Sequence, residues 1–128
     1  MNTLNDIFGV HEQALTLRAR RLELLASNIS NADTPHFKAR DVDFAQALRR
    51  AGDSMLRTTD SRHFDIAQPG SGTEPVKYRV PFNVAADGNT VEIGVEQAQY
   101  GKAAGDYRAS LAFIESRTSA IRRALKGE

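Results

Sequence analysis

The sequence predicts a mainly α-helical protein, in which long N- and C-terminal helices pair as a coiled-coil-like bundle around an irregular middle containing a small β-ribbon. Apolar residues recur at steps of three and four near both ends of the 128 residues, which predicts the two helices. A nine-residue alternation of apolar and polar residues between them predicts a strand. We expect a single domain, 1–128, with an N-terminal helix at 1–31, a middle at 32–90 that holds a turn, a short helix and the strand, and a C-terminal helix at 91–128.

The N-terminal helix is expected to run from Leu4 to Ile29. One line of apolar residues along it is Leu4, Phe8, Leu15, Leu22, Leu25 and Ile29. A second line beside the first is Ile7, Val10, Ala14, Leu17 and Leu24. Together the two lines make a stripe that is wider than one partner helix covers. This helix is therefore expected to have at least two neighbours.

The chain leaves this helix through a marked break at 31–35. Asn31 is expected to take the left-handed conformation at the end of the helix, and Pro35 disfavours helical backbone just before it. A short second helix is expected over 41–50, ended by the Ala-Gly-Asp sequence at 51–53. Its apolar side would carry Phe44, Ala47 and Leu48.

The alternating segment Val76–Val84 is the predicted strand. Five apolar residues fall on one face, namely Val76, Tyr78, Val80, Phe82 and Val84. Pro81 has no backbone donor, which places the strand at the edge of a sheet. Phe64 and Ile66 offer a short partner, so a hairpin or ribbon is expected here.

The C-terminal helix is expected from Val91 to Lys126. Its apolar line is Tyr100, Ala104, Tyr107, Leu111, Ile114, Thr118, Ile121 and Leu125. A second line holds only small residues: Gly94, Ala98, Gly101, Gly105, Ala109, Ala112 and Ser116. These glycines indicate either close approach of another backbone or a helix kept marginally stable, since each costs roughly 1 kcal/mol relative to alanine.

Composition narrows the class of protein. With 17 basic and 16 acidic residues the net charge is +1, which argues against a nucleic-acid-binding protein. The chain has no cysteine, so it can form neither a disulfide nor a thiolate metal site. No apolar run approaches the ~18 residues of a membrane span. The N-terminal residues lack the pattern of a cleaved secretory signal, so we expect either retention in the cytoplasm or export by another route.

No group of residues has the pattern of a catalytic or metal site. His11, His36 and His63 are far apart in sequence and have no ligand spacing. Asp41 and Asp43 could be imagined as paired catalytic carboxylates, but acidic residues at a helix start more often cap it. We therefore expect no enzymatic activity, no cofactor and no metal.

The segment from Leu22 to Phe44 resembles the signature near the N-terminus of bacterial flagellar rod and hook proteins. Its run from Lys38 to Phe44 is similar to the proximal rod subtype of the basal-body rod proteins, the FlgB family. The motif positions that carry the resemblance are Ser27, Asn28, Asn31, Asp33, Thr34, Pro35, Lys38, Arg40, Asp41 and Phe44. Two departures stand out: His36 occupies a position where the family usually has glycine, and Gly101 and Gly105 replace bulkier residues.

The resemblance implies a non-enzymatic subunit that polymerises through its terminal helices to form the drive shaft and line the export channel. It implies contacts with copies of itself, other rod proteins, the membrane-embedded ring and the export apparatus. It places the protein in the periplasmic rod of the basal body, exported without a cleaved signal peptide. The assembly seam would comprise Leu15, Leu22, Leu25, Ile29, Tyr107, Leu111, Ile114 and Ile121. The alternative is a soluble helical adaptor or export chaperone that binds partners without polymerising.

Overall fold

The computed structural model describes residue 8 and residues 10–55 and 76–127. The elements are, in chain order, helix α2 (Val10–Ser30), strand β1 (Arg40–Val42), helix α3 (Phe44–Met55), strand β2 (Val76–Tyr78) and helix α4 (Ile93–Lys126). The strands β1 and β2 pair antiparallel in a small sheet in the middle of the chain. The prediction of a mainly helical fold with long terminal helices and a small β-ribbon is confirmed.

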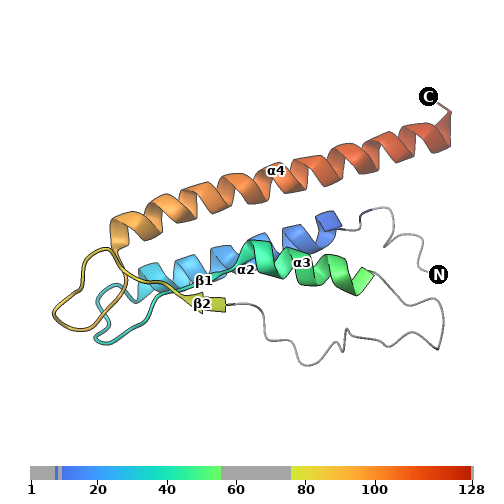
Figure 1. Ribbon diagram of the computed structural model, residues 1–128. Helices are drawn as coiled ribbons and strands as arrows, with labels where there is room; N and C mark the ends of the chain where they lie inside the picture. The colour runs from blue at the N-terminus through green and yellow to red at the C-terminus, as the bar shows by residue number, and fades with distance from the viewer. Residues whose placement is uncertain (1–7, 9, 56–75, 128) are drawn as a thin grey trace, which may run out of the picture.

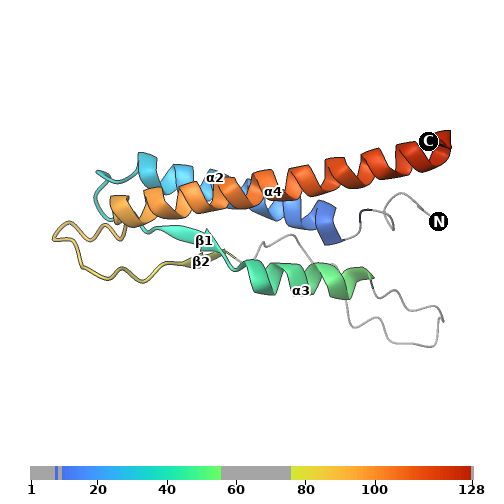
Figure 2. The same cartoon turned by 90° about the horizontal axis from the view of Figure 1, so that it is seen from above.

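Helices α2 and α4 run antiparallel and pack side by side, as both views show (Figures 1 and 2). The 34 residues of α4 make it about 51 Å long. The turns that follow α2 and precede α4 lie together at one end of this elongated molecule, and the C-terminus lies at the other (Figure 1). Helix α3 and the sheet lie along one side of the helix pair (Figure 2).

The apolar core is small. Leu24 of α2, Val42 of β1 and Ala47 of α3 are buried against one another, with Leu17 and Val76 packed at their edge. Each of the first four elements therefore contributes a side chain to one cluster. Helix α4 adds no residue to this cluster, so other contacts must attach it to the rest of the chain.

The middle of the chain departs from the sequence prediction at both ends of the short helix. Residues 41 and 42 belong to strand β1 instead of the predicted helix, because Val42 pairs with Val76 of β2. Helix α3 starts after Asp43, whose Oδ1 accepts a hydrogen bond from the amide of Gln46 at 3.1 Å and so caps it. The helix continues to Met55, so the predicted end at 51–53 is wrong. The suggested partners of the second strand, Phe64 and Ile66, lie outside the described residues.

The predicted strand is also shorter than expected, since β2 ends at Tyr78. The amide of Arg79 still donates to the carbonyl of Ala39 at 2.9 Å, which continues the ladder by one bond. Farther on, the amides of Phe82 and Asn83 donate to the carboxylate of Glu92 at 3.0 and 3.1 Å. These bonds take the backbone away from β1, so the alternating apolar residues after Tyr78 do not belong to the sheet.

The turn after α2 places its left-handed residue at His36, where φ is 60°. The prediction of this conformation for Asn31 is wrong, because its amide still bonds to the carbonyls of Ser27 and Asn28 in a helix-like turn. The His36 amide donates to Asp87 at 3.0 Å, which holds the turn against the loop before α4. Histidine therefore adopts here a backbone conformation that glycine adopts without strain.

Replacing His36 with glycine should raise the free energy of unfolding by about 1 kcal/mol, since a left-handed non-glycine residue costs roughly that amount. Urea denaturation of the purified proteins measures the change. His36→Ala is the matched control, because it removes the same imidazole and keeps the Cβ. Equal stability of the glycine and alanine variants would contradict the strain at this position.

Candidate assembly interface

Asn28, at the centre of the motif, joins α2 to both β1 and α4. Its side chain is 1% exposed. The Nδ2 group donates to the carbonyl of Arg40 at 2.8 Å and to Oε2 of Glu96 at 3.0 Å. Its Oδ1 accepts from the amide of Arg40 at 3.1 Å. The Asn28 side chain thus pairs with the backbone N–H and C=O of Arg40 in β1, as a neighbouring strand would. It also bonds to Glu96 in the first turn of α4.

Glu96 is fully buried and lies in a chain of charged groups. Its Oε1 lies 2.8 Å from Nη1 of Arg79, an ion pair whose angle does not make a hydrogen bond. The other terminal nitrogen of Arg79, Nη2, lies 2.7 Å from Oδ2 of Asp41. Removing one member of such a buried set leaves its neighbours charged and without compensation, which is strongly destabilising.

Asp41 also binds Arg21 through both of its oxygens. Nε of Arg21 lies 2.9 Å from Oδ1, and Nη2 lies 3.0 Å from Oδ2, a paired geometry typical of arginine and carboxylate. The hydrogen bond to Asp41 raises the pKa of Arg21, so the guanidinium stays charged. Nη2 also donates to Oε1 of Gln99 on α4 at 3.1 Å. We call this connected set the clasp: Arg21, Asn28, Asp41, Arg79, Glu96 and Gln99.

A second set of bonds joins the turn after α2 to the loop before α4. Asn89 is 4% exposed, and its Nδ2 lies within 3.0 Å of the carbonyl oxygens of Asn31, Ala32 and Thr34. Thr90 donates its amide to Phe37 at 3.0 Å. These bonds therefore hold the loop before α4 against the residues that follow α2. We call residues 31–38 and 80–92 the tip.

The remaining motif residues have local roles or lie at the surface. The side-chain amide of Asn31 donates to the carbonyl of Ser27 at 2.8 Å, and Thr34 donates to Asn31 at 3.1 Å. Lys38 donates to the carbonyl of Gly88 at 2.7 Å. The exposed motif residues are Asp33, Thr34, Pro35, Lys38 and Arg40. The motif therefore builds a rigid connection between the two ends of the chain.

The residues of the assembly seam are distributed between the inside and the surface of the helix pair. Leu25 is fully buried. The half-buried members are Leu15, Leu22, Ile29, Tyr107, Ile114 and Ile121. Leu111 is 37% exposed, and Phe113 and Leu125, also on α4, are 48% and 83% exposed.

The two fully buried positions of α4 are a polar and a small residue, and neither belongs to the apolar line that the sequence suggested. The buried residues of α4 are Glu96 and Ala103. Sequence reasoning missed Glu96, since a single glutamate in a polar helix has no signal that distinguishes it from a surface residue. The line of small residues is exposed, and a Cβ at Gly94, Gly101 or Gly105 would meet nothing within 4 Å.

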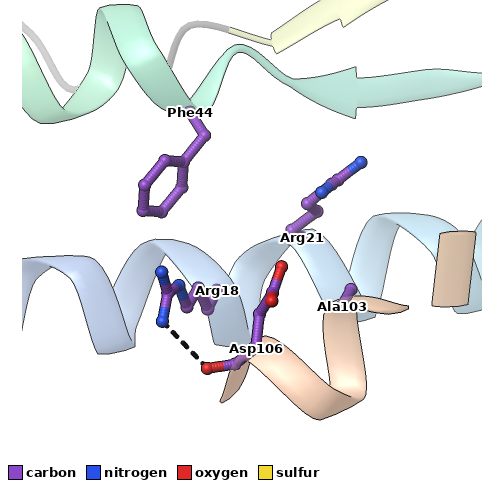
Figure 3. A pocket seen from close by; sticks show the side chains of 5 residues that line it. All are labelled: Arg18, Arg21, Phe44, Ala103 and Asp106. Carbon is purple, nitrogen blue, oxygen red and sulfur yellow. Dashed lines mark hydrogen bonds between the residues drawn. The ribbon is translucent and has the colours of Figure 1, made fainter. Parts of the chain in front are cut away.

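A small pocket of about 110 Å³ lies between α2, α3 and α4 (Figure 3). It is lined by Arg18, Arg21, Phe44, Ala103 and Asp106. Arg18 lies 5.2 Å from the centre of the Phe44 ring and donates to the carbonyl of Asp106 at 2.9 Å and to the hydroxyl of Ser110. Both guanidinium groups are thus already paired, and the pocket is part of the packing between the helices.

The carboxylates considered for catalysis have structural partners. Asp41 belongs to the clasp, and Asp43 pairs with Lys77 at 2.6 Å, which together with the amide of Gln46 lowers the pKa of Asp43. The ring of His11 packs against that of Phe113, with the centroids 4.5 Å apart and the rings tilted by 40°. Within residues 10–55 and 76–127, no three His, Cys, Asp or Glu side chains gather in a way that could hold a metal ion. Over the same described ranges, none of the helices combines the length and apolar character needed to cross a membrane.

Comparisons with known proteins find the same family that the motif resembles. The family model described as flagella basal body rod protein matches residues 8–38. The flagellar basal body rod protein FlgB of Cereibacter sphaeroides is 48% identical over the full length of both chains. The protein of the same name from Aeromonas hydrophila is 42% identical over 98% of this chain and 97% of its own.

The similarity extends to more distant bacteria. The FlgB protein of Salmonella typhimurium is 34% identical, over 99% of this chain and 98% of its own. Because these matches cover nearly the whole of both chains, they include the tip, the clasp and α4 as well as the motif. The resemblance seen in the sequence is confirmed, and the chain belongs to the FlgB family of flagellar basal body rod proteins.

Proposed function

We propose that this protein is a structural, non-enzymatic subunit of the proximal rod, which polymerises through its terminal helices to form the drive shaft and line the export channel. The observation that carries the proposal is the apolar surface of α4 that its own chain leaves uncovered. Leu111, Phe113 and Leu125 are all more than a third exposed. Large apolar side chains left exposed at several positions along a helix are candidates for burial against other proteins.

The clasp explains how such a surface can be presented in a fixed direction. Polar contacts, including buried ones at Asn28 and Glu96, attach α4 to α2 and the sheet. Some apolar residues of α4, such as Leu111 and Leu125, consequently stay exposed although the helix is firmly attached. A helix pair that is fixed by polar contacts and keeps apolar side chains exposed is suited to packing among copies of itself.

The partners in this proposal are copies of the chain, other rod proteins, and the membrane-embedded ring and export apparatus at the base of the rod. The protein would act in the periplasmic rod and reach it without a cleaved signal peptide. Support comes from the family membership and from the uncovered surface of α4.

A deletion strain with an epitope-tagged copy restored tests the function. The deletion should leave cells without rods and without flagella, and the tagged copy should restore both. The tagged protein should also co-purify with isolated basal bodies, which separates a rod subunit from an adaptor or export chaperone that is left behind. Flagellated deletion cells, or purified basal bodies that lack the protein, would contradict the proposal.

The small-residue line of α4 gives a further prediction about assembly. A Cβ at Gly101 meets no atom of the described residues within 4 Å, so Gly101→Leu should leave the monomer folded and at least as helical. If another helix packs on this line, the added side chain overfills each contact by about 1–3 kcal/mol, and rods should be lost.

Circular dichroism of the purified protein and counts of rods in cells measure the two effects. Gly101→Ala is the control, because it raises helix propensity and adds only one carbon. If the glycines serve only to weaken the helix, both variants will assemble. Normal rods with Gly101→Leu would therefore show that no close contact exists on this line.

A further inference from the structure

Three large apolar residues of the tip, at every second position of one short segment, expose their side chains. Val80, Phe82 and Val84 are 86%, 85% and 88% exposed. They belong to the alternating pattern that the sequence assigned to a strand, and the structure gives them no place in the sheet. A chain that exposes three such side chains in one short segment has surface to bury against another molecule.

Specific bonds hold the backbone that carries these side chains. The segment begins at Arg79, whose amide bonds to Ala39 and whose guanidinium belongs to the clasp. At its centre the amides of Phe82 and Asn83 donate to the carboxylate of Glu92. The apolar residues are thus displayed by a fixed backbone, as a preorganised contact requires.

Another largely exposed apolar side chain, that of Leu125, lies at the far end of α4. Figure 1 shows the loop between β2 and α4 at one end of the molecule and the C-terminus at the other. Leu125, near that C-terminus, is 83% exposed. Two surfaces that need covering therefore lie at opposite ends of one elongated subunit.

The charges of these two ends are opposite. The tip, 31–38 and 80–92, carries Asp33, Asp87 and Glu92 against Lys38, a formal net charge of −2 with histidine neutral. The last part of α4, 111–127, has a formal net charge of +3, since one glutamate stands against four basic residues: Glu115, Arg117, Arg122, Arg123 and Lys126. Two protein surfaces of opposite charge attract each other, which speeds their encounter and fixes the orientation in which they bind.

We infer that Val80, Phe82 and Val84 of one subunit dock on the apolar, basic C-terminal end of α4 of a second copy. The contact joins two different surfaces, so each subunit keeps one free surface of each kind and the arrangement can repeat along the polymer. The inference rests on the proposed function, and it deepens that function by naming the surfaces that join successive copies.

Cysteine cross-linking in cells tests the contact, because the chain has no cysteine of its own. Two differently tagged copies, Val84→Cys and Leu125→Cys, are produced together in the deletion strain and treated with a short bismaleimide. Basal bodies are then purified and probed for a product carrying both tags. The matched control replaces Leu125→Cys with Ala98→Cys, an exposed position near the other end of α4. The inference predicts the doubly tagged product with position 125 and at most a tenth as much with position 98.

A second arm removes the apolar contact without changing charge. Adding Phe82→Ser to the Val84→Cys copy should lower the yield of that product about tenfold, since an exposed phenylalanine buried on assembly contributes strongly to a contact. Asn83→Ser, at the adjacent exposed position, should leave the yield unchanged, and circular dichroism should show both variants folded.

The outcomes separate this inference from the proposed function. If rods contain the protein but position 84 cross-links to a different rod protein, or equally to 98 and 125, the docking of copies is wrong while the function stands. The same holds if Phe82→Ser gives unchanged yield. If purified basal bodies lack the protein altogether, the proposed function fails and the inference fails with it.

Discussion

Replacing Asn28 with alanine is expected to lower the free energy of unfolding by about 3 kcal/mol or more. The change leaves the amide and carbonyl of Arg40 and one oxygen of Glu96 without their bonds, and each buried group left unpaired costs roughly 1–3 kcal/mol. Urea denaturation of the full chain, followed by circular dichroism, measures the loss.

Ser27→Ala is the control for this prediction. Ser27 is the neighbouring motif residue. Its backbone carbonyl, and not its hydroxyl, accepts hydrogen bonds from Ser30 and Asn31. Its replacement should change the stability by less than about 0.5 kcal/mol, as is usual away from buried polar groups. A similar loss in both variants would show that the motif acts through the helix end and not through the clasp.

Introducing a carboxylate at Leu111 is expected to abolish incorporation into rods while leaving the monomer folded. Leu111 is 37% exposed in the single chain, so a glutamate there can reach water before assembly. On assembly the same carboxylate would lose its water, at a cost of several kcal/mol. Incorporation of Leu111→Glu, measured as tagged protein in purified basal bodies, should fall below about a tenth of the unmodified level.

Ala45→Glu supplies the matched control, because Ala45 is an exposed residue of α3 and lies outside the terminal helices. It adds the same side chain and the same charge. The account predicts normal folding of both variants and incorporation of Ala45→Glu alone. Rods that accept Leu111→Glu as readily would remove Leu111 from the assembly surface.

The parts of the fold that were predictable from the sequence are those set by local periodicity. Both long helices follow from apolar spacing, and Asp43 caps α3 as an acidic residue at a helix start does. Strand β1 was not predicted, since its three residues carry no alternation and it exists only because Val76 pairs with Val42 across the chain. Pairing between distant segments leaves no local pattern in a single sequence.

The clasp was beyond sequence reasoning for a related physical reason. In the sequence Asn28 is one of several polar residues near the end of α2, where Asn31 bonds to a carbonyl of its own helix. Asn28 instead reaches β1 and Glu96, which lies 68 positions away. Whether a polar side chain in a helix is exposed or buried depends on the partner that the fold brings to it, and neither spacing nor composition reports that partner.

Electron cryo-microscopy of isolated basal bodies tests the central claim most directly. The account predicts that density for α2 and α4 of successive copies forms the inner wall of the rod around the channel, with the apolar surface at Leu111 packed against a neighbouring helix. Rods in which this chain is absent, or in which α4 carries Leu111 facing open solvent while another element joins the copies, would contradict it.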